Sequence, residues 1–282
     1  MNIPILIADS GSTKTDWLLM LDEKQRCIVQ TQGINPDYLS EEQIFEIITA
    51  ELLPQMPSAM SQLSAIYFYG AGCRQDVSHH LVNVLHKCFK AQTIEVKSDI
   101  LAVAHATCKH EAGIACILGT GSNSCLFDGN KIVSQTPSLG YVLGDEGSGT
   151  VLGKLLVGDV FKHIAPQNII ESFISEYQVD VSSLLNKVYK QQLPNRYLAS
   201  FTKFLSKHIE EDYIQILLND EFSRFIQRNL LAYDAKDLPV HFVGSIAHVF
   251  QKNLETSIRQ AGLKMGVVMK SPLEGLAAYH LA

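Results

Sequence analysis

The pattern of apolar and polar positions in the first 110 residues predicts short strands followed by alternating helices and strands. The apolar runs IPILIAD (3–9), WLLML (17–21) and CIVQTQ (27–32) are bounded by turn residues, which is typical of strands. SEEQIFEIITAELL (40–53) has apolar residues at helical spacing, and Ser40 and Gln43 occupy the positions of a capping box. We then expect a strand, a helix, a strand and a helix at 65–70, about 76–90, 93–99 and 100–107. This order indicates an α/β layer.

The second half of the chain restarts the same pattern. GIACILGTGSNSCLFDG (113–129) is an apolar run, a Gly/Ser/Thr turn and a second apolar run, and 6–12 can be aligned on 116–122. The alignment superposes Gly11 on Gly121 and Ser12 on Ser122, which indicates an internal repeat and two related lobes. Two short Gly/Ser turns can also match by chance.

Helical patterns fill much of the remaining sequence. The region 168–235 is expected to form several helices, and its apolar stripe at 198, 201, 204 and 205 is expected in a core. LPVHFVGSIAHVF (238–250) predicts a strand, a Gly-Ser turn and a helix, and the chain closes on a helix over 271–282. We therefore expect one lobe over 1–110, which the closing helix can complete, and another over 111–270 with a helical insertion at about 168–235.

Composition excludes several classes of protein. The net charge of −6 with scattered basic residues argues against a nucleic-acid surface. No run of 18 apolar residues and no signal peptide is visible, so the sequence favours a cytoplasmic protein without a membrane span. The six cysteines show no metal-like spacing, and those at 116 and 125 are expected to be buried free thiols. His79 and His80 are expected on a solvated helix face, without an acidic or cysteine partner.

Two Gly/Ser/Thr turns between strands are candidate phosphate-binding loops, because such turns expose backbone N–H groups and hydroxyls. The P-loop and Rossmann fingerprints are both absent. Asp9 ends an otherwise apolar run just before the first turn. An acid at such a position is costly to bury unless it is paired or bound to a metal, which favours a functional role.

Four segments, ADSGSTKTDW, LGTGSNS, GYVLGDEGSG and FVGSIA, occur in this order over residues 8 to about 250. The first, the second and the last of them resemble the phosphate-1, phosphate-2 and adenosine motifs of the actin, Hsp70 and sugar-kinase fold. Within that fold the sequence is most similar to the BadF/BadG/BcrA/BcrD ATPase family, especially its N-acetylglucosamine kinase members. The resemblance implies a two-lobed, ribonuclease H-like α/β fold that holds nucleotide and sugar in the interlobe cleft.

The resemblance also implies a role for individual residues in an ATP- and Mg²⁺-dependent kinase that phosphorylates a hydroxyl of an amino sugar. Asp9 matches the metal-organising acid, and Asp99 matches the acid that takes the proton from the sugar hydroxyl. Phosphate and nucleoside contacts are implied for Gly11, Ser12, Thr13, Lys14, Gly119, Thr120, Gly121, Gly244 and Ser245. Sugar contacts are implied for Asn35, Asp99, Gly140 and Asp145. The partner is then a small sugar, with a homodimer possible and neither nucleic acid nor membrane involved.

Each of these roles has a simpler structural alternative. Asp99 can cap the helix that begins at Ile100, and Asn35 before Pro36 suits an ordinary turn. Asp145 can be a loop acid, and Lys14 can be a solvated turn residue. The human-type enzyme has GWGH where this sequence has Leu-Gly-Tyr at 139–141, which leaves the sugar open among N-acetylglucosamine, glucosamine, N-acetylmuramic acid and others.

Two other functions remain open. A related ATPase activates 2-hydroxyacyl-CoA dehydratases with an iron–sulfur cluster shared across a dimer, and Cys125 follows the second turn. The segment GTGSNS, however, has the kinase-like Asn123 and no cysteine just before it. A non-catalytic sugar sensor of the same fold is the other alternative, against which the retention of both Asp9 and Asp99 argues.

Overall fold

The computed structural model describes residues 4–11, 13–22, 25–57, 62–73 and 78–281. The chain divides into two compact units. The first unit combines Met1–Lys109 with Pro272–Ala282, and the second is His110–Ser271. The first unit is therefore built from two separate stretches of chain, whereas the second is continuous.

The first unit contains a five-stranded mixed sheet in the order β3-β2-β1-β4-β5. Three strands form an antiparallel meander, and two further strands extend it in parallel to β1. The strands are β1 (Ile5–Ser10), β2 (Lys14–Met20), β3 (Arg26–Gln32), β4 (Leu63–Gly70) and β5 (Ala91–Ser98). The strands expected from the apolar runs are confirmed.

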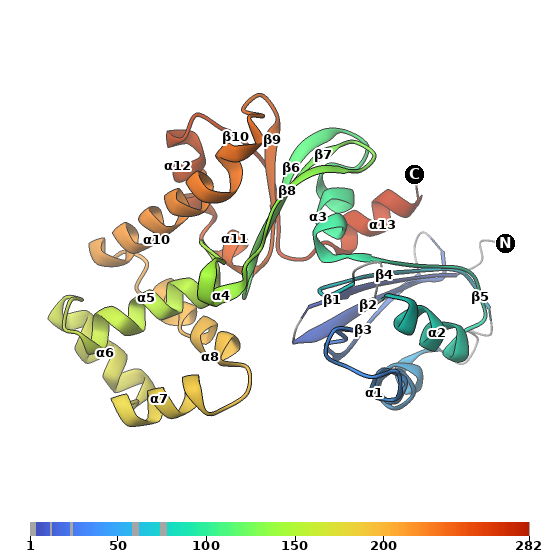
Figure 1. The fold of residues 1–282 in the computed structure, drawn as a ribbon, viewed down its shortest axis with the longest axis horizontal. Helices are drawn as coiled ribbons and strands as arrows, with labels where there is room; N and C mark the ends of the chain where they lie inside the picture. The colour runs from blue at the N-terminus through green and yellow to red at the C-terminus, as the bar shows by residue number, and fades with distance from the viewer. Residues whose placement is uncertain (1–3, 12, 23–24, 58–61, 74–77, 282) are drawn as a thin grey trace. The chain divides into compact units, whose positions relative to one another are not determined.

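Helices cover both faces of this sheet (Figure 1). Successive side chains of a strand point to opposite faces, and in β1 Leu6 and Ala8 pack in one core whereas Ile7 packs in another. The first core includes α1 (Glu41–Ile47) and α2 (Ser78–Cys88). The second includes α3 (Asp99–Thr107) and α13 (Leu273–Leu281). The expected helices are confirmed, although the helix that starts at 41 changes to a π-helical turn at Ile48–Leu52.

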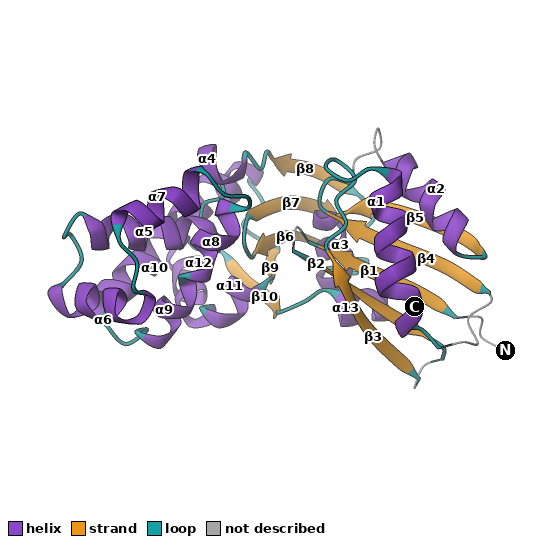
Figure 2. Cartoon of the chain, turned by 90° about the horizontal axis from the view of Figure 1, so that it is seen from below, coloured by secondary structure: helices purple, strands orange, loops and turns teal. Residues whose placement is uncertain are grey.

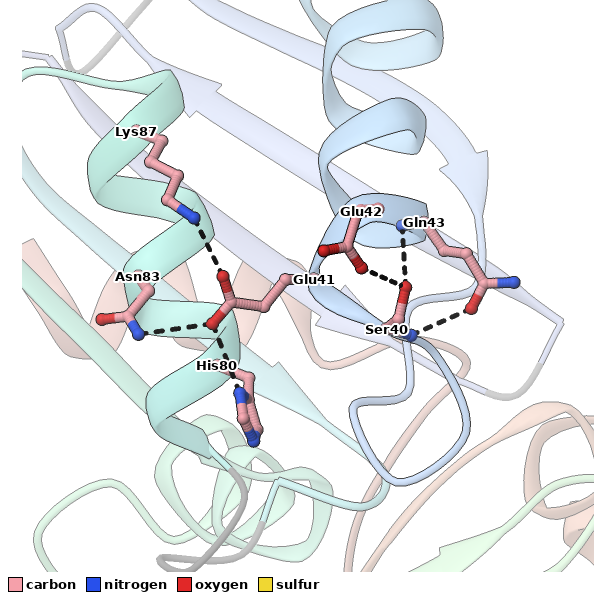
Figure 3. Close-up of polar contacts among 7 residues, drawn as sticks. All are labelled: Ser40, Glu41, Glu42, Gln43, His80, Asn83 and Lys87. Atoms are coloured by element: carbon pink, nitrogen blue, oxygen red, sulfur yellow. Dashed lines mark hydrogen bonds and ion pairs between the residues drawn. The ribbon is translucent and has the colours of Figure 1, made fainter.

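A capping box begins α1, as the sequence predicts. Gln43 donates its backbone N–H to the Ser40 side chain, and its own side chain accepts from the Ser40 N–H. Next to this box, Glu41 accepts hydrogen bonds from Lys87, His80 and Asn83 of α2 (Figure 3). These bonds lower the pKa of Glu41 to about 2. His80 is exposed as expected, but the expectation that it lacks an acidic partner is wrong, because folding brings α1 beside α2.

A small aromatic cluster joins β4 to the two helices on the second face. The Tyr69 hydroxyl lies 2.9 Å from His105 Nδ1 of α3 and 2.9 Å from His280 Nε2 of α13. Tyr67 stacks on the His280 ring with centroids 3.6 Å apart. Burial and the charge of Lys97 lower the pKa of His280 to about 4, so its imidazole is neutral in this cluster near pH 7.

The second unit repeats the topology of the first sheet, in the order β10-β9-β6-β7-β8. An antiparallel meander of three strands is again extended by two strands parallel to the first. The strands are β6 (Ala112–Leu118), β7 (Ser122–Asp128), β8 (Ile132–Thr136), β9 (Pro239–Val243) and β10 (Lys264–Met269). The shared order supports the internal repeat seen in the sequence.

Helices form the larger part of the second unit (Figure 2). They pack with the sheet in one core that includes Phe201, Phe204 and Leu205 of the expected apolar stripe. A π-helical turn, Ile226–Leu230, follows α10 directly. The helices are α4 (Gly140–Leu143), α5 (Gly149–Phe161), α6 (Gln167–Tyr177), α7 (Val181–Tyr189), α8 (Pro194–Ser200), α9 (Thr202–Lys207), α10 (Asp212–Phe225), α11 (Ser245–Val249) and α12 (Gln251–Gln260).

Two further properties follow from the described residues. Within them, every helix is too short or too polar to cross a lipid bilayer. None of the six cysteines, all of which are described, forms a disulfide bond, and Cys116 and Cys125 are fully buried as expected.

Candidate functional site

Asp9 lies at the end of β1, after three fully buried apolar residues. Its backbone is opposite Asp16 of β2 and Tyr69 of β4, so the sheet places the carboxylate where the antiparallel and parallel parts of the sheet meet. The side chain is partly accessible. Backbone pairing on both sides holds this acid in place.

The carboxyl group of Asp9 has an unusually high pKa. Burial is the largest cause, the charges of Asp16 and Asp99 add to it, and Lys14 opposes it, giving a pKa of about 7. Asp9 and Asp99 are therefore close enough to interact through their charges, although 90 residues separate them in sequence. A concentration of negative charge of this kind attracts a cation.

The first turn connects β1 to β2 through a short hydrogen-bonded loop. The Gly11 N–H donates to the Lys14 carbonyl at 3.0 Å, and the Thr13 carbonyl accepts from the Gly33 N–H at 3.2 Å. The Lys14 ammonium pairs with Asp16 at 2.7 Å and is half exposed. Ser12, which the sequence assigns to this phosphate loop, lies outside the described residues.

The segment 33–35 is fastened to β1 by buried hydroxyl groups. Ser10 Oγ donates to the Ile34 carbonyl at 2.8 Å and accepts from the Ile34 N–H at 3.0 Å, while Thr15 Oγ1 lies 2.7 Å from Ser10 Oγ. Asn35 Oδ1 accepts from the Asp37 N–H at 2.9 Å, which is the turn role considered for it. The same oxygen lies against Gly72, where an added Cβ would come within 2.1 Å of it. Asn35 therefore packs on the turn that follows β4.

Asp99 is the first residue of α3, and Ser98 occupies the cap position. Asp99 Oδ1 accepts from the N–H of the next residue, Ile100, at 2.8 Å, which is not the usual bond from a cap to the second or third helical residue. Burial raises the pKa of Asp99 above its ordinary value, against the effect of the Ile100 N–H. Helix capping alone therefore does not account for this acid.

In the second unit the turn 119–121 is bonded to the start of α5. The Gly119 N–H donates to the Gly121 carbonyl at 3.0 Å, and the Gly119 carbonyl accepts from the Gly149 N–H at 2.8 Å. The Thr120 carbonyl accepts from Thr150 Oγ1 at 2.6 Å and from the Thr150 N–H at 3.2 Å. These bonds fix the loop and orient its backbone.

Asp145 lies beside this same turn. Its Oδ1 accepts from the Ser122 N–H at 3.2 Å, and an added Cβ on Gly121 would lie 3.1 Å from its Oδ2. Burial raises the pKa of Asp145, although the Ser122 N–H and the Ser138 hydroxyl lower it in part. Gly140 begins α4 at a φ of +69°, with open space where a side chain would stand. The structure therefore brings Asp145 to the second turn, whereas the bond from Gly144 ties Gly140 to its own helical turn.

Gly244 lies in a third loop of the site, which contacts the end of β6 and the turn 119–121. It follows β9, which runs parallel to β6, and it has a φ of +132°. A Cβ at this position would be 2.2 Å from the Leu118 carbonyl oxygen and 3.1 Å from the Gly119 nitrogen. Only glycine permits this approach. Ser245 then begins α11, so the second unit gathers 119–121, 145 and 244–245 around the end of β6.

The carboxylates near Asp9 fit a partial Mg²⁺ site, completed by water and phosphate oxygens, better than a metal site made of protein ligands alone. Among the described residues, no three His, Cys, Asp or Glu side chains come together as a complete metal site. Mg²⁺ is commonly held by one or two carboxylates together with water and phosphate oxygens. The acidic surroundings of Asp9 fit such a partial site.

Several neighbours of these residues were not found by sequence reasoning. Cys73 is buried. Burial, followed by the smaller effects of the Asp99 and Asp37 charges, raises the pKa of its thiol to about 12. A thiol near Asp99, and the Thr150 bonds to the second turn, depend on contacts between distant segments. Local sequence patterns do not predict such contacts.

Comparison with known proteins places the chain in a family. The chain matches the putative N-acetylglucosamine kinase of Porphyromonas gingivalis over 98% of both chains, with 43% sequence identity and a TM-score of 0.95. The chain belongs to the family of that protein.

More distant members of the fold support the architecture alone. A putative N-acetylglucosamine kinase of Chromobacterium violaceum matches over 99% of both chains at 13% identity and a TM-score of 0.75. A ROK family glucokinase of Streptomyces griseus, in complex with glucose and AMPPNP, covers 98% of this chain and 99% of its own at 14% identity and a TM-score of 0.57. The predicted actin-like α/β fold is confirmed.

No model of a known protein family and no curated protein matches the chain. The narrower resemblance to the BadF/BadG/BcrA/BcrD family therefore stays a prediction.

Proposed function

We propose that the protein is an ATP-dependent kinase that phosphorylates a hydroxyl group of an amino sugar, with N-acetylglucosamine as the first candidate acceptor. The observation that carries this proposal is the membership of the chain in the family of a putative N-acetylglucosamine kinase at 43% identity. The interaction of Asp9 with Asp99 supports it, because a kinase of this type needs one acid for the metal and another for the acceptor.

ATP and Mg²⁺ are the proposed cofactors. Binding of AMPPNP by the Streptomyces griseus glucokinase supports a nucleotide on this fold. We assign phosphate contacts to the turns 11–14 and 119–121 and nucleoside contacts to Gly244 and Ser245. Asp9 would hold Mg²⁺ directly or through water, and the bound ion would neutralise charge on the phosphates.

Asp99 is the proposed general base. Its pKa is raised mainly by burial, and a higher pKa makes the carboxylate a stronger base towards the sugar hydroxyl. The bond from the Ile100 N–H orients its carboxylate, leaving one oxygen for the sugar hydroxyl. We assign further sugar contacts to Asn35, Gly140 and Asp145, whose side chains or backbone lie on ordered turns.

A sugar-dependent ADP-release assay tests the proposal. The purified protein is supplied with MgATP and a panel of N-acetylglucosamine, glucosamine, N-acetylmuramic acid, N-acetylmannosamine and glucose. We expect ADP release above the sugar-free rate with an amino sugar, together with a phosphorylated product detected by mass spectrometry. Asp128→Asn, which alters an exposed acid at the end of β7, serves as the control variant.

Two results would contradict the proposal. Sugar binding without ADP release would favour a sensor. Sugar-independent ATP hydrolysis with iron–sulfur absorbance in anaerobically purified protein would favour a dehydratase activator. Against the latter, Cys125 is fully buried within β7, whereas a cluster shared across a dimer needs ligands at the surface.

A further inference from the structure

The loop that carries Asp145 has an unfavourable backbone conformation. Asp145 has a φ of +59° and Gly147 a φ of +74°. A left-handed conformation is disfavoured for an aspartate, and it persists only where the surroundings enforce it. Asp145 should therefore be held in place by neighbouring groups.

The next residue, Glu146, is 6% exposed. Arg228 Nε lies 2.5 Å from Glu146 Oε1, and Asn229 Nδ2 donates to Glu146 Oε2 at 3.3 Å. Burial raises the pKa of Glu146, but hydrogen bonding and the Arg228 charge outweigh that effect, so its pKa lies below the ordinary value. Glu146 is therefore a buried anion with both oxygens engaged.

Arg228 and Asn229, which both contact Glu146, lie on a π-helical turn. Ile226–Leu230 follows α10 without a break, and such turns often occur at functional sites. The Asn229 carbonyl accepts from Ser124 Oγ at 3.3 Å and from Thr136 Oγ1 at 2.9 Å. These bonds tie the π-helical turn to β7 and β8.

Two residues of α10 contact Gly147, the residue that follows Glu146. Glu221 Oε1 accepts from the Gly147 N–H at 3.1 Å. The Phe225 side chain packs so closely under Gly147 that an added Cβ would lie 3.0 Å from it. Asp145 is thus followed directly by two residues with fixed positions, Glu146 and Gly147.

We propose that Arg228 and Asn229 are positioning residues that act through Glu146 to hold the Asp145 carboxylate in its sugar-binding orientation. The inference rests on the proposed function, because it assigns to Asp145 a contact with the sugar acceptor. Arg228 itself is half exposed at the surface, so its substitution tests positioning with little disturbance of the core.

The test combines amide hydrogen exchange with kinetics on the full chain. Arg228→Gln removes the charge, and Arg228→Lys restores it. The control is Arg259→Gln, which removes another arginine–glutamate pair, with Glu255, from α12 of the same unit. We expect Arg228→Gln to speed exchange in a peptide covering 144–150 but not in α12, whereas Arg228→Lys and Arg259→Gln leave that peptide close to wild type.

Kinetics with N-acetylglucosamine and MgATP then show whether the effect passes through Asp145. We expect Arg228→Gln to raise the sugar KM by about tenfold, in the range found when a group that orients a ligand is removed, and to leave the ATP KM unchanged. In an Asp145→Asn background the same substitution should have almost no further effect, because residues in one network are not additive.

Two outcomes would overturn the inference. One is unchanged exchange at 144–150 in Arg228→Gln. The other is a full, independent loss of activity when Arg228→Gln is combined with Asp145→Asn. A wild-type protein that phosphorylates none of the sugars would instead refute the proposed function, and the exchange comparison would still decide whether Arg228 holds the loop.

Discussion

Asp9→Asn should make the protein more stable at alkaline pH while removing its metal-dependent activity. The ordinary pKa of the carboxyl is 3.8, and in the folded protein it is about 7, chiefly because of burial and then because of Asp16 and Asp99. A group whose pKa is raised by folding favours the folded state at low pH, and this contribution is lost as the pH rises through the folded value. Asparagine has the same size but does not titrate.

The size of the effect follows from the pH window. Below about pH 4 Asp9 is protonated in both the folded and the unfolded chain. Between pH 4 and 7 the unfolded chain releases the proton and the folded protein retains it, so the free energy of unfolding falls by about 1.4 kcal/mol per pH unit. Two of these units lie between pH 5 and 7, which predicts a loss of about 2–3 kcal/mol from pH 5 to 8.

Differential scanning calorimetry in EDTA, without nucleotide, measures this prediction. The Tm of the wild type relative to Asp9→Asn should fall by roughly 5–10 °C between pH 5 and 8. Comparing the two pH values cancels any constant difference between asparagine and protonated aspartate. Asp128→Asn is the control, because backbone N–H groups of Lys131 and Asn130 lower the Asp128 pKa and its titration ends below this window. Equal pH dependence of wild type and Asp9→Asn would show that Asp9 is not destabilised by its surroundings.

Three further predictions concern single residues. Asp99→Asn should lower kcat by about 10²–10⁴-fold, since an amide cannot accept the proton, with a smaller change in sugar Kd; wild-type kcat would leave Asp99 without a catalytic role. His280, with its pKa lowered to about 4, should cost stability as the pH falls from 6.5 towards 4, by up to about 3 kcal/mol. In His280→Gln the fall in Tm over that range should be shallower, and an unchanged slope would contradict this. Gly244→Ala should destabilise the protein by more than about 2 kcal/mol in urea unfolding, because its Cβ meets the Leu118 carbonyl at a positive φ. The control Gly158→Ala, in open space within α5, should gain up to about 1 kcal/mol.

The sequence was a good guide wherever structure depends on neighbouring residues. The strands could be predicted because each is a short apolar run between turn residues, and the Ser40 capping box because both partners lie within one helical turn. The repeated turns at 11 and 121 also pointed to two sheets of one topology.

Contacts between distant segments could not be predicted from local sequence patterns. Asn229 and Glu146 are 83 residues apart, and the π-helical turn that brings them together has no distinctive composition. In the same way His80 meets Glu41 across 39 residues, so no local pattern indicates this acidic partner. The charge of Asp99 on Asp9 belongs to this class too, because it arises only when β5 and β1 join one sheet.

Because the first unit is built from two separate stretches of chain, its folding during synthesis depends on the segment that is made last. Its second core needs Leu273 and Leu276 of α13 beside Ile7 and Ala102, and Gly275 packs so closely on α3 that a Cβ would lie 2.5 Å from the Ala106 carbonyl. These residues leave the ribosome after the whole of His110–Ser271, which is continuous and has its own core. Domains generally fold as units while the chain is being made. The unit that is translated first is therefore the last to be completed, and its exposed apolar face must wait for α13.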